Sequence, residues 1–389
     1  MISKMSDFYR SLKRSTMRPN IVIVICLALL FALIAGQSFA VDLEVVARLD
    51  VGPGNITVTP DNRIILSLHP FYSNNDRVVE LRKDGKLVPF PDKSWNQGNT
   101  RNNGSAFDSV LGIQCDTNGV VWMLDTGLRN LSEQKLVGWD TVNNRLHKVV
   151  NLIPPKPETK IALPETAFLN DLAVDPNNRV CYISHSGGVK NSAIVVVDLE
   201  TGTSRYVLQG HKSVQPEEIS LVMEHRKLNF TLPDFGKLPI LIGVNPIALD
   251  ASNEWLYYGP MNGKSMYRIR TADLRNANLT SSELADRVER YSYKPICDGI
   301  SIDNGGNIYI SDLEANAIGV ITPDRRYKEL IQDASISWPE SFSFGPDGYL
   351  YFVASQLHRS APLNNGKEAA KAPFYVFRIK GLAPGVVGR

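Results

Sequence analysis

One phrase of roughly fifteen residues recurs six times along this 389-residue chain, and it restricts the possible folds more than any other feature. The clearest copy reads DGISIDNGGNIYISD, in which two alternating apolar runs flank a polar turn that holds Asn304, Gly305 and Gly306. Such a pattern is typical of a β-hairpin with one buried face. The six copies occupy residues 54–69, 111–125, 170–185, 245–259, 298–312 and 340–354.

The spacing of the copies predicts an all-β fold, a six-bladed β-propeller. Successive copies start 42 to 75 residues apart, and further strand-like runs follow each of them. A period near fifty residues with Asn, Gly and Pro turns is typical of a propeller with one four-stranded blade per repeat. We expect the N- and C-terminal runs 43–49 and 374–379 to pair in one blade and close the ring. No helix of any length is expected beyond residue 40.

Two segments interrupt the repeat. The longest interval between copies contains residues 210–239, which are polar and hold several prolines. We interpret this segment as an excursion between blades that covers one face of the ring. A second long loop, residues 357–373, interrupts the last blade.

The first forty residues are predicted to be a signal peptide. Five basic residues precede an uninterrupted apolar run over residues 21–35, and Ser38-Phe39-Ala40 has the small-x-small form of a cleavage site. We expect cleavage after Ala40, which makes the protein secreted or periplasmic, and residues 41–389 then form one propeller domain. The alternative is an uncleaved membrane anchor, because the apolar run is short for a span but the basic region is long.

Charge and cysteine content narrow the function classes. The whole chain has a formal net charge of +2, whereas residues 41–389 carry 37 basic and 39 acidic side chains. A nearly neutral domain argues against nucleic acid as a partner. The three cysteines of this part, Cys115, Cys181 and Cys297, allow at most one disulfide and fit neither a zinc site nor a redox motif.

The repeat also predicts a site. In a propeller the first strand of each blade lines the central channel, so the first residues of the six copies should meet at one mouth. Two amides and two carboxylates among them form an oxygen-rich set suited to Ca²⁺, or to Mg²⁺ or Mn²⁺. The alternative is that they cap strand ends around water, but neighbouring carboxylates at a dry mouth favour a cation. The four candidate metal ligands are Asn170, Asn245, Asp298 and Glu340.

The last residues of the copies are expected to form a second ring above the first. His69 and His185 are the candidate catalytic residues in this ring, because histidine exchanges protons near neutral pH. Alternatively, each histidine hydrogen-bonds a loop, and Asp125 and Asp312 form turns. Asp171 directly follows a candidate ligand and is therefore expected to point to the other side of its strand.

Four stretches of the chain are distinctive: SVLGIQCDTNGVVWMLDTG (109–127), LVPFPDKSW (87–95), FLNDLAVD (168–175) and the closing run 298–379. They resemble the Yellow/major royal jelly protein family, and the resemblance covers nearly all of residues 41–389. It implies a secreted six-bladed propeller, with members described as dopachrome-converting tautomerases and others as binders of small amines or sterols.

The resemblance extends to the wider senescence-marker-protein/gluconolactonase superfamily, whose divalent metal is held by a Glu, two Asn and an Asp at first-strand starts. Asn170, Asn245 and Asp298 match three of these positions in order, whereas Gly54 stands where that family has its Glu. We expect Glu340, one blade round the closed ring, to supply the missing carboxylate. The departure bears on metal affinity and on lactonase activity.

Two functions follow as hypotheses. In the first, a metal at the four ligands polarises the carbonyl of a small cyclic ester or quinone-like substrate, and Asp298 or a histidine moves the proton. The reaction is then gluconolactonase-like lactone hydrolysis or dopachrome-type tautomerisation. In the second, the same mouth binds a small aromatic amine or lipid-like ligand without turnover. A third possibility is a protein-interaction scaffold that uses the propeller rim.

Overall fold

The structure, a computed structural model, describes residues 41–97, 106–127, 133–152, 168–187, 190–232 and 236–389. Residues Val41–Arg389 form one compact unit. Residues 1–40, with the predicted signal peptide and cleavage site, lie outside the described residues. Over the described ranges, no helix is long and apolar enough to cross a membrane.

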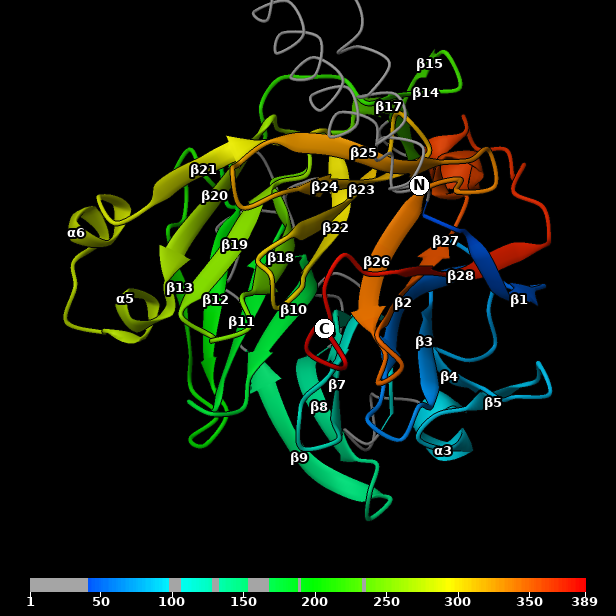
Figure 1. The fold of residues 1–389 in the computed structure, drawn as a ribbon, viewed down its shortest axis with the longest axis horizontal. Helices are drawn as coiled ribbons and strands as arrows, with labels where there is room; N and C mark the ends of the chain where they lie inside the picture. The colour runs from blue at the N-terminus through cyan, green and yellow to red at the C-terminus, as the bar shows by residue number, and fades with distance from the viewer. Residues whose placement is uncertain (1–40, 98–105, 128–132, 153–167, 188–189, 233–235) are drawn as a thin grey trace, which may run out of the picture. The chain divides into compact units, whose positions relative to one another are not determined.

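Six four-stranded antiparallel sheets surround a common axis, which confirms the predicted six-bladed propeller (Figure 1). Each copy of the repeated phrase forms the two innermost strands of one blade. From the axis outward, blade one consists of β2 (Pro53–Val58), β3 (Ile64–Leu68), β4 (Val78–Leu81) and β5 (Leu87–Pro89). Blade two consists of β6 (Val110–Cys115), β7 (Val120–Asp125), β8 (Gln134–Asp140) and β9 (Arg145–Leu152). Blade three consists of β10 (Leu169–Asp175), β11 (Val180–His185), β12 (Ala193–Asp198) and β13 (Ser204–Val207). Blade four consists of β18 (Val244–Leu249), β19 (Trp255–Pro260), β20 (Ser265–Arg270) and β21 (Glu289–Tyr293). Blade five consists of β22 (Cys297–Ile302), β23 (Ile308–Asp312), β24 (Ala317–Ile321) and β25 (Tyr327–Gln332). Blade six consists of β26 (Pro339–Phe344), β27 (Tyr349–Ala354), β28 (Phe374–Lys380) and β1 (Glu44–Leu49).

The two ends of the propeller sequence pair in the sixth blade, as predicted. Strand β1 pairs antiparallel with β28, from Glu44 opposite Arg378 to Leu49 opposite Phe374. The Arg378 guanidinium donates to Glu44 Oε2 at 2.8 and 2.7 Å. Because β1 is the outermost strand of a blade whose other three strands come from the C-terminal end, this pairing closes the ring.

The repeated Asp at the tip of the inner hairpins explains why the phrase recurs. Asp303 Oδ1 accepts the backbone N–H groups of Gly305 and Asn307, both at 2.9 Å. Gly306 follows with a φ of +77°, a conformation that glycine adopts without strain. Because the carboxylate accepts hydrogen bonds from backbone N–H groups of its own turn, it fixes the register of the hairpin.

Every inner strand carries a register shift at the same place, and this shift positions the site. In β10 the pairing jumps from Leu169 to Leu172, and equivalent shifts occur in β2, β6, β18, β22 and β26. A bulge leaves two residues of one strand opposite a single residue of the partner strand. The side chains of these two residues therefore no longer alternate between the two faces of the sheet. Asn170 and Asp171 therefore occupy one bulge and can both face the channel.

The hydrophobic core lies between neighbouring blades. Tyr182 and Ile194 of blade three pack in one buried cluster with Ile247 and Tyr258 of blade four. The expectation of no helix was wrong in detail, because the described residues include three single-turn α-helices outside the blades. They are α3 (Lys93–Gln97), α5 (Thr271–Arg275) and α6 (Ser281–Ala285), and the last begins with a capping box between Thr280 and Glu283.

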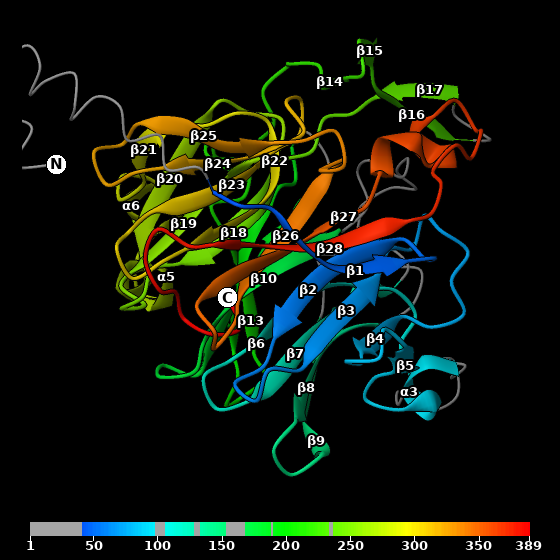
Figure 2. The ribbon, with the colours of Figure 1, turned by 45° about the vertical axis from the view of Figure 1, so that its right-hand side comes forward.

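The two insertions contact each other on one side of the ring (Figure 2). Arg226 donates to the carbonyl oxygens of His358 at 2.8 Å and Leu363 at 3.0 Å. Met223 and Ile240 of the first insertion share a buried cluster with Leu357 of the second. The elements of the insertions are β14 (Val222–Met223), β15 (Arg226–Lys227), β16 (Asn229–Leu232), β17 (Gly236–Pro239), η3 (Leu357–Arg359) and η4 (Ala361–Leu363).

Candidate functional site

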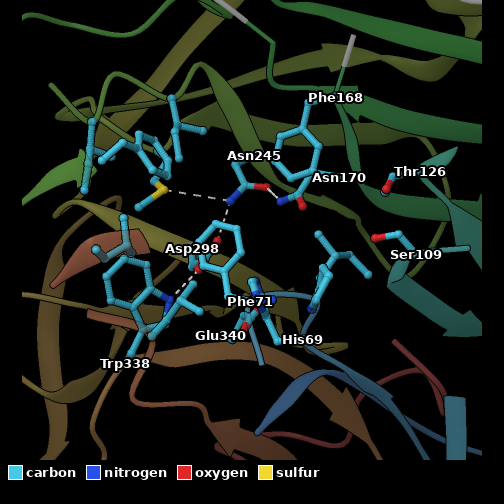
Figure 3. A pocket seen from close by; sticks show the side chains of 18 residues that line it. His69, Phe71, Ser109, Thr126, Phe168, Asn170, Asn245, Asp298, Trp338 and Glu340 are labelled. Atoms are coloured by element: carbon cyan, nitrogen blue, oxygen red, sulfur yellow. Dashed lines mark hydrogen bonds between the residues drawn. The ribbon is translucent and has the colours of Figure 1, made fainter. Parts of the chain in front are cut away.

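Three of the predicted metal ligands meet at the starts of inner strands from consecutive blades (Figure 3). The Asn170 amide donates to Asn245 Oδ1, and the Asn245 amide donates to Asp298 Oδ1. The side chains of Asn245 and Asp298 are 3% and 8% exposed, so their polar groups depend on one another for partners. The two amides and this carboxylate thus form a continuous polar chain across three blades.

Trp338 holds the other oxygen of Asp298, a role that the sequence did not reveal. Its indole Nε1 donates to Asp298 Oδ2 at 2.7 Å, and the ring is only 2% exposed. The residue has a φ of +56°, which is uncommon for a bulky side chain and marks a backbone constrained by its surroundings. The only sequence signal is its place two residues before Glu340.

Glu340 contributes a second carboxylate and has an unmatched oxygen. Its Oε2 atom is buried and has no hydrogen-bond partner among the described residues. Burial, and then the negative charge of Asp298, raise the pKa of Glu340 well above its usual range. Burial also raises the pKa of Asp298 to about 6, although hydrogen bonds from Trp338 and Asn245 oppose the rise. Two carboxyl groups that destabilise each other's charge are suited to sharing a cation.

The donor set fits a hard divalent cation. It supplies two carboxylates and two amide oxygens, which are ligand types of Ca²⁺ and Mg²⁺, and the unmatched Glu340 oxygen has room for a further bond. Within the described ranges, no cluster of three or more His, Cys, Asp or Glu side chains is placed to bind a metal. The fit therefore depends on Asn170 and Asn245 as well as on the acids.

Asp171 faces the channel, which corrects the expectation that it points away. The bulge at Asn170 turns both residues inward, and Asp171 lies with Asn55 in a second polar layer directly beneath the candidate ligands. Asn55 Nδ2 donates to Asp171 Oδ1 at 3.3 Å. Burial raises the pKa of Asp171 to about 7. Sequence reasoning missed Asn55 because it looked only at Gly54, the other residue of the same bulge.

The predicted second ring does not form. His185 pairs with Leu169, the residue before the bulge, and opposed residues of an antiparallel pair point to the same face. Its imidazole is 3% exposed, approaches Asn191 O at 2.9 Å through Nδ1 and does not line the cavity. Asp125 instead forms a buried ion pair with Lys135 at 3.1 Å, and Asp312 accepts a hydrogen bond from Tyr327 at 2.6 Å.

His69 is the candidate proton-transfer residue that does reach the cavity. It directly follows β3 and turns over the mouth with Phe71, whose backbone N–H donates to His69 Nδ1 at 3.1 Å. The cavity thus contains His69, Asn170, Asn245, Asp298 and Glu340 but not His185.

The cavity above the ligands has a volume of about 310 Å³ and is mostly apolar. The insertions supply part of its wall, and none of the described residues that line it is a lysine or arginine. Four aromatic rings line the cavity together with two carboxylates, so it is an apolar chamber with a polar floor. Its apolar lining residues are Pro70, Phe71, Leu111, Phe168, Phe230, Ile240, Ile242, Met261, Trp338, Leu357 and Leu363.

The three cysteines of this part of the chain, Cys115, Cys181 and Cys297, are buried free thiols. No disulfide therefore links the blades that contain them.

Comparison with protein-family models decides the family. The model of the major royal jelly protein family matches residues 108–369, which is more than half of the chain. The chain belongs to the major royal jelly protein family. The match includes five of the six inner strands and all four candidate ligands. No curated protein sequence matches the chain significantly.

Solved structures with the same fold include enzymes and a calcium-binding protein. A gluconolactonase from Xanthomonas campestris is 11% identical, with a TM-score of 0.54 over 90% of this chain and 92% of its own. A luciferin-regenerating enzyme is 13% identical, with a TM-score of 0.54 over 90% and 98%. Regucalcin from Agrobacterium tumefaciens, a calcium-binding protein, is 14% identical, with a TM-score of 0.52 over 90% and 98%. At these identities the likeness extends to the fold alone.

Proposed function

We propose that this royal jelly family member is a metal-dependent enzyme that acts on a small cyclic carbonyl compound at the channel mouth. The reaction is lactone hydrolysis or a dopachrome-type tautomerisation. The observation that carries the proposal is the unmatched Glu340 oxygen, which lies with three other oxygen-bearing side chains at the floor of a mostly apolar cavity. Gluconolactonases and a calcium-binding protein among the structures of the same fold support it.

Each side chain has a distinct part in this proposal. A divalent cation, most simply Ca²⁺, held by Asn170, Asn245, Asp298 and Glu340 would polarise the substrate carbonyl when bound. Trp338 fixes the orientation of Asp298 through the hydrogen bond at 2.7 Å. The apolar walls exclude bulk water and favour substrates with few hydroxyl groups.

His69 is the group that moves the proton in this proposal. It is the histidine among the cavity-lining residues, and a neutral imidazole can accept a proton from an attacking water or from a substrate carbon. His185 is not given this role, because it lies outside the cavity.

The test combines metal analysis with a substrate panel on one preparation. Elemental analysis of the purified protein is followed by assays with aliphatic lactones, glucono-lactone and dopachrome, before and after chelation. Asp298→Asn keeps an acceptor for Trp338 but removes the charge, and we expect it to lose metal and turnover together. Asp312→Asn, in the same blade but outside the cavity, is the matched control. Turnover that survives chelation and Asp298→Asn would refute the proposal.

A second candidate function is binding without turnover. It is favoured by the combination of four aromatic rings and two carboxylates in a lining whose described residues include no lysine or arginine. This combination suits a small aromatic amine or a lipid-like molecule. Quenching of tryptophan fluorescence by such ligands, with an inert substrate panel, would favour this function over the enzyme.

We also propose that the N-terminal segment directs export of the protein. Because the domain is nearly neutral, we propose that its partner is a small molecule rather than nucleic acid. N-terminal sequencing of the protein from its natural host tests this: a mature start at Val41 supports cleavage, and an intact Met1 in a membrane fraction supports the anchor.

A further inference from the structure

Residues 381–389 lie across the end of the channel opposite the cavity. All six inner strands run in the same direction, so the candidate ligands mark their starts and this segment meets their ends. Figure 1 shows the C-terminus at the centre of the ring, close to β10 and β26. The segment reads GLAPGVVGR and follows directly on β28.

This one segment contacts, in every blade, the inner strand or one of the two residues that follow it. On one side, Thr57 of β2 donates to Gly388 O at 2.9 Å, and Cys115 of β6 packs against Gly388. On the other side, Phe344 of β26 donates to Arg389 O at 2.7 Å, and Asn304, just after β22, donates to Pro384 O at 2.8 Å. The segment contacts blades three and four through one of its side chains.

That side chain is the guanidinium of Arg389. It donates to Val174 O in β10 at 3.0 Å and to Asp250 O just after β18 at 3.1 Å. The residue is only 8% exposed, so a permanently charged group is held inside the channel by strand-end carbonyls. Hydrogen bonds that involve a charged donor are stronger than neutral ones when both groups are buried.

The glycines of the segment allow it to approach the strands closely. Gly388 has a φ of +92°, and a Cβ atom there would lie 2.2 Å from Cys115 O. A Cβ atom on Gly385 would lie 2.0 Å from the Phe344 ring. The mouth therefore fits this sequence and would reject side chains at both positions.

A polar chamber separates the segment from the candidate metal ligands. Its wall includes Asn55, Gln114, Asp171 and Ser341, and Arg389 closes it on the far side. The cavity that holds the candidate ligands thus has one sealed end.

We propose that the lower mouth of the channel is a peptide-binding site and that residues 381–389 are its intramolecular ligand. Bound there, the segment clamps all six blades at the ends of their inner strands and closes the channel. It is a second closure of the ring, independent of the β1–β28 pairing, and it does not depend on the proposed enzymatic activity. The upper cavity is then the route to the site.

The first experiment separates the segment from its site. A variant that ends at Lys380 is mixed with a fluorescent synthetic peptide of residues 381–389, and binding is followed by anisotropy. We expect saturable binding to the shortened protein and none to the full chain, whose own segment occupies the mouth. A peptide with Arg389→Ala should bind at least about tenfold more weakly, because it loses two charged hydrogen bonds. Equal binding of both peptides, or equal binding to both proteins, would overturn the proposal.

The second experiment keeps the full chain, in case the shortened variant does not fold. Arg389→Ala is compared with Arg326→Ala, whose side chain is 79% exposed. Hydrogen exchange of the Phe344 and Asn304 amides reports on the segment, and the Ile56 amide, bonded to Ser341 Oγ at 2.9 Å, reports on the strands themselves. We expect exchange at least about tenfold faster at the first two amides only, and only in Arg389→Ala. Unchanged exchange at Phe344 would refute the clamp.

Discussion

Trp338 Nε1 donates a hydrogen bond of 2.7 Å to Asp298 Oδ2, and this contact joins a strained backbone position to the floor of the cavity. The indole also stacks on the buried ring of His358, with centroids 6.3 Å apart. Because His358 belongs to the second insertion, Trp338 contacts both the insertion that forms part of the cavity wall and Asp298 at the cavity floor.

Replacing Trp338 by Phe should therefore destabilise the protein and disturb Asp298. The variant leaves a buried carboxylate oxygen without its donor, which costs about 1–3 kcal/mol of unfolding free energy. Denaturant unfolding measures the loss. Trp255→Phe is the control, because Trp255 is not among the residues that line the cavity. Equal losses of unfolding free energy in the two variants would mean that the hydrogen bond to Asp298 does not contribute to stability.

Metal binding should stabilise the folded chain through the four ligands. Calcium at about one hundred times its dissociation constant would raise the unfolding free energy by about 2.7 kcal/mol, and a chelator would reverse the gain. Glu340→Gln should remove most of the effect, whereas Glu329→Gln on the exposed surface of β25 should keep it. Thermal unfolding with and without Ca²⁺ measures both. A calcium response that is the same in the two variants would exclude Glu340 as a ligand.

Asp171 should make the metal-free protein less stable as the pH rises. Burial raises its folded pKa to about 7, above the value of about 4 for an unfolded aspartate. The folded state binds the proton more tightly, so this contribution is complete below pH 4 and is lost as the pH rises toward 7. Asp171→Asn should remove roughly 1–3 kcal/mol of the decline between these values. Urea unfolding of chelated protein at several pH values tests the difference; parallel curves would contradict it.

His185 should act in the opposite direction. Burial lowers its folded pKa to about 4, below the value of about 6.5 for an unfolded histidine. The unfolded chain binds the proton more tightly, so stability is lost as the pH falls from 6.5 toward 4, by up to about 3 kcal/mol. His185→Asn keeps a donor for Asn191 O and should flatten this loss. Turnover should remain in His185→Asn, whereas His69→Asn should abolish it. The reverse result would return the catalytic role to His185.

The sequence by itself determined the ring and the position of its polar floor. Alternating residues around an Asp-headed turn specify a hairpin locally, and six copies with paired ends specify six blades. The first residue of each copy must lie at the start of a channel strand, so Asn170, Asn245, Asp298 and Glu340 could be grouped without coordinates.

The tertiary structure decided what no local pattern encodes. The shared bulge places Asn55 and Asp171 in the channel, and His185 pairs with Leu169 outside the cavity, because pairing register depends on the partner strand rather than on alternation alone. Trp338 reaches Asp298 only because its backbone adopts a φ of +56°. Arg389 contacts Val174 and Asp250, which belong to two other blades, because the folded ring brings the ends of their inner strands to the same mouth. These contacts join residues 40 to 215 positions apart, and long-range packing alone brings them together.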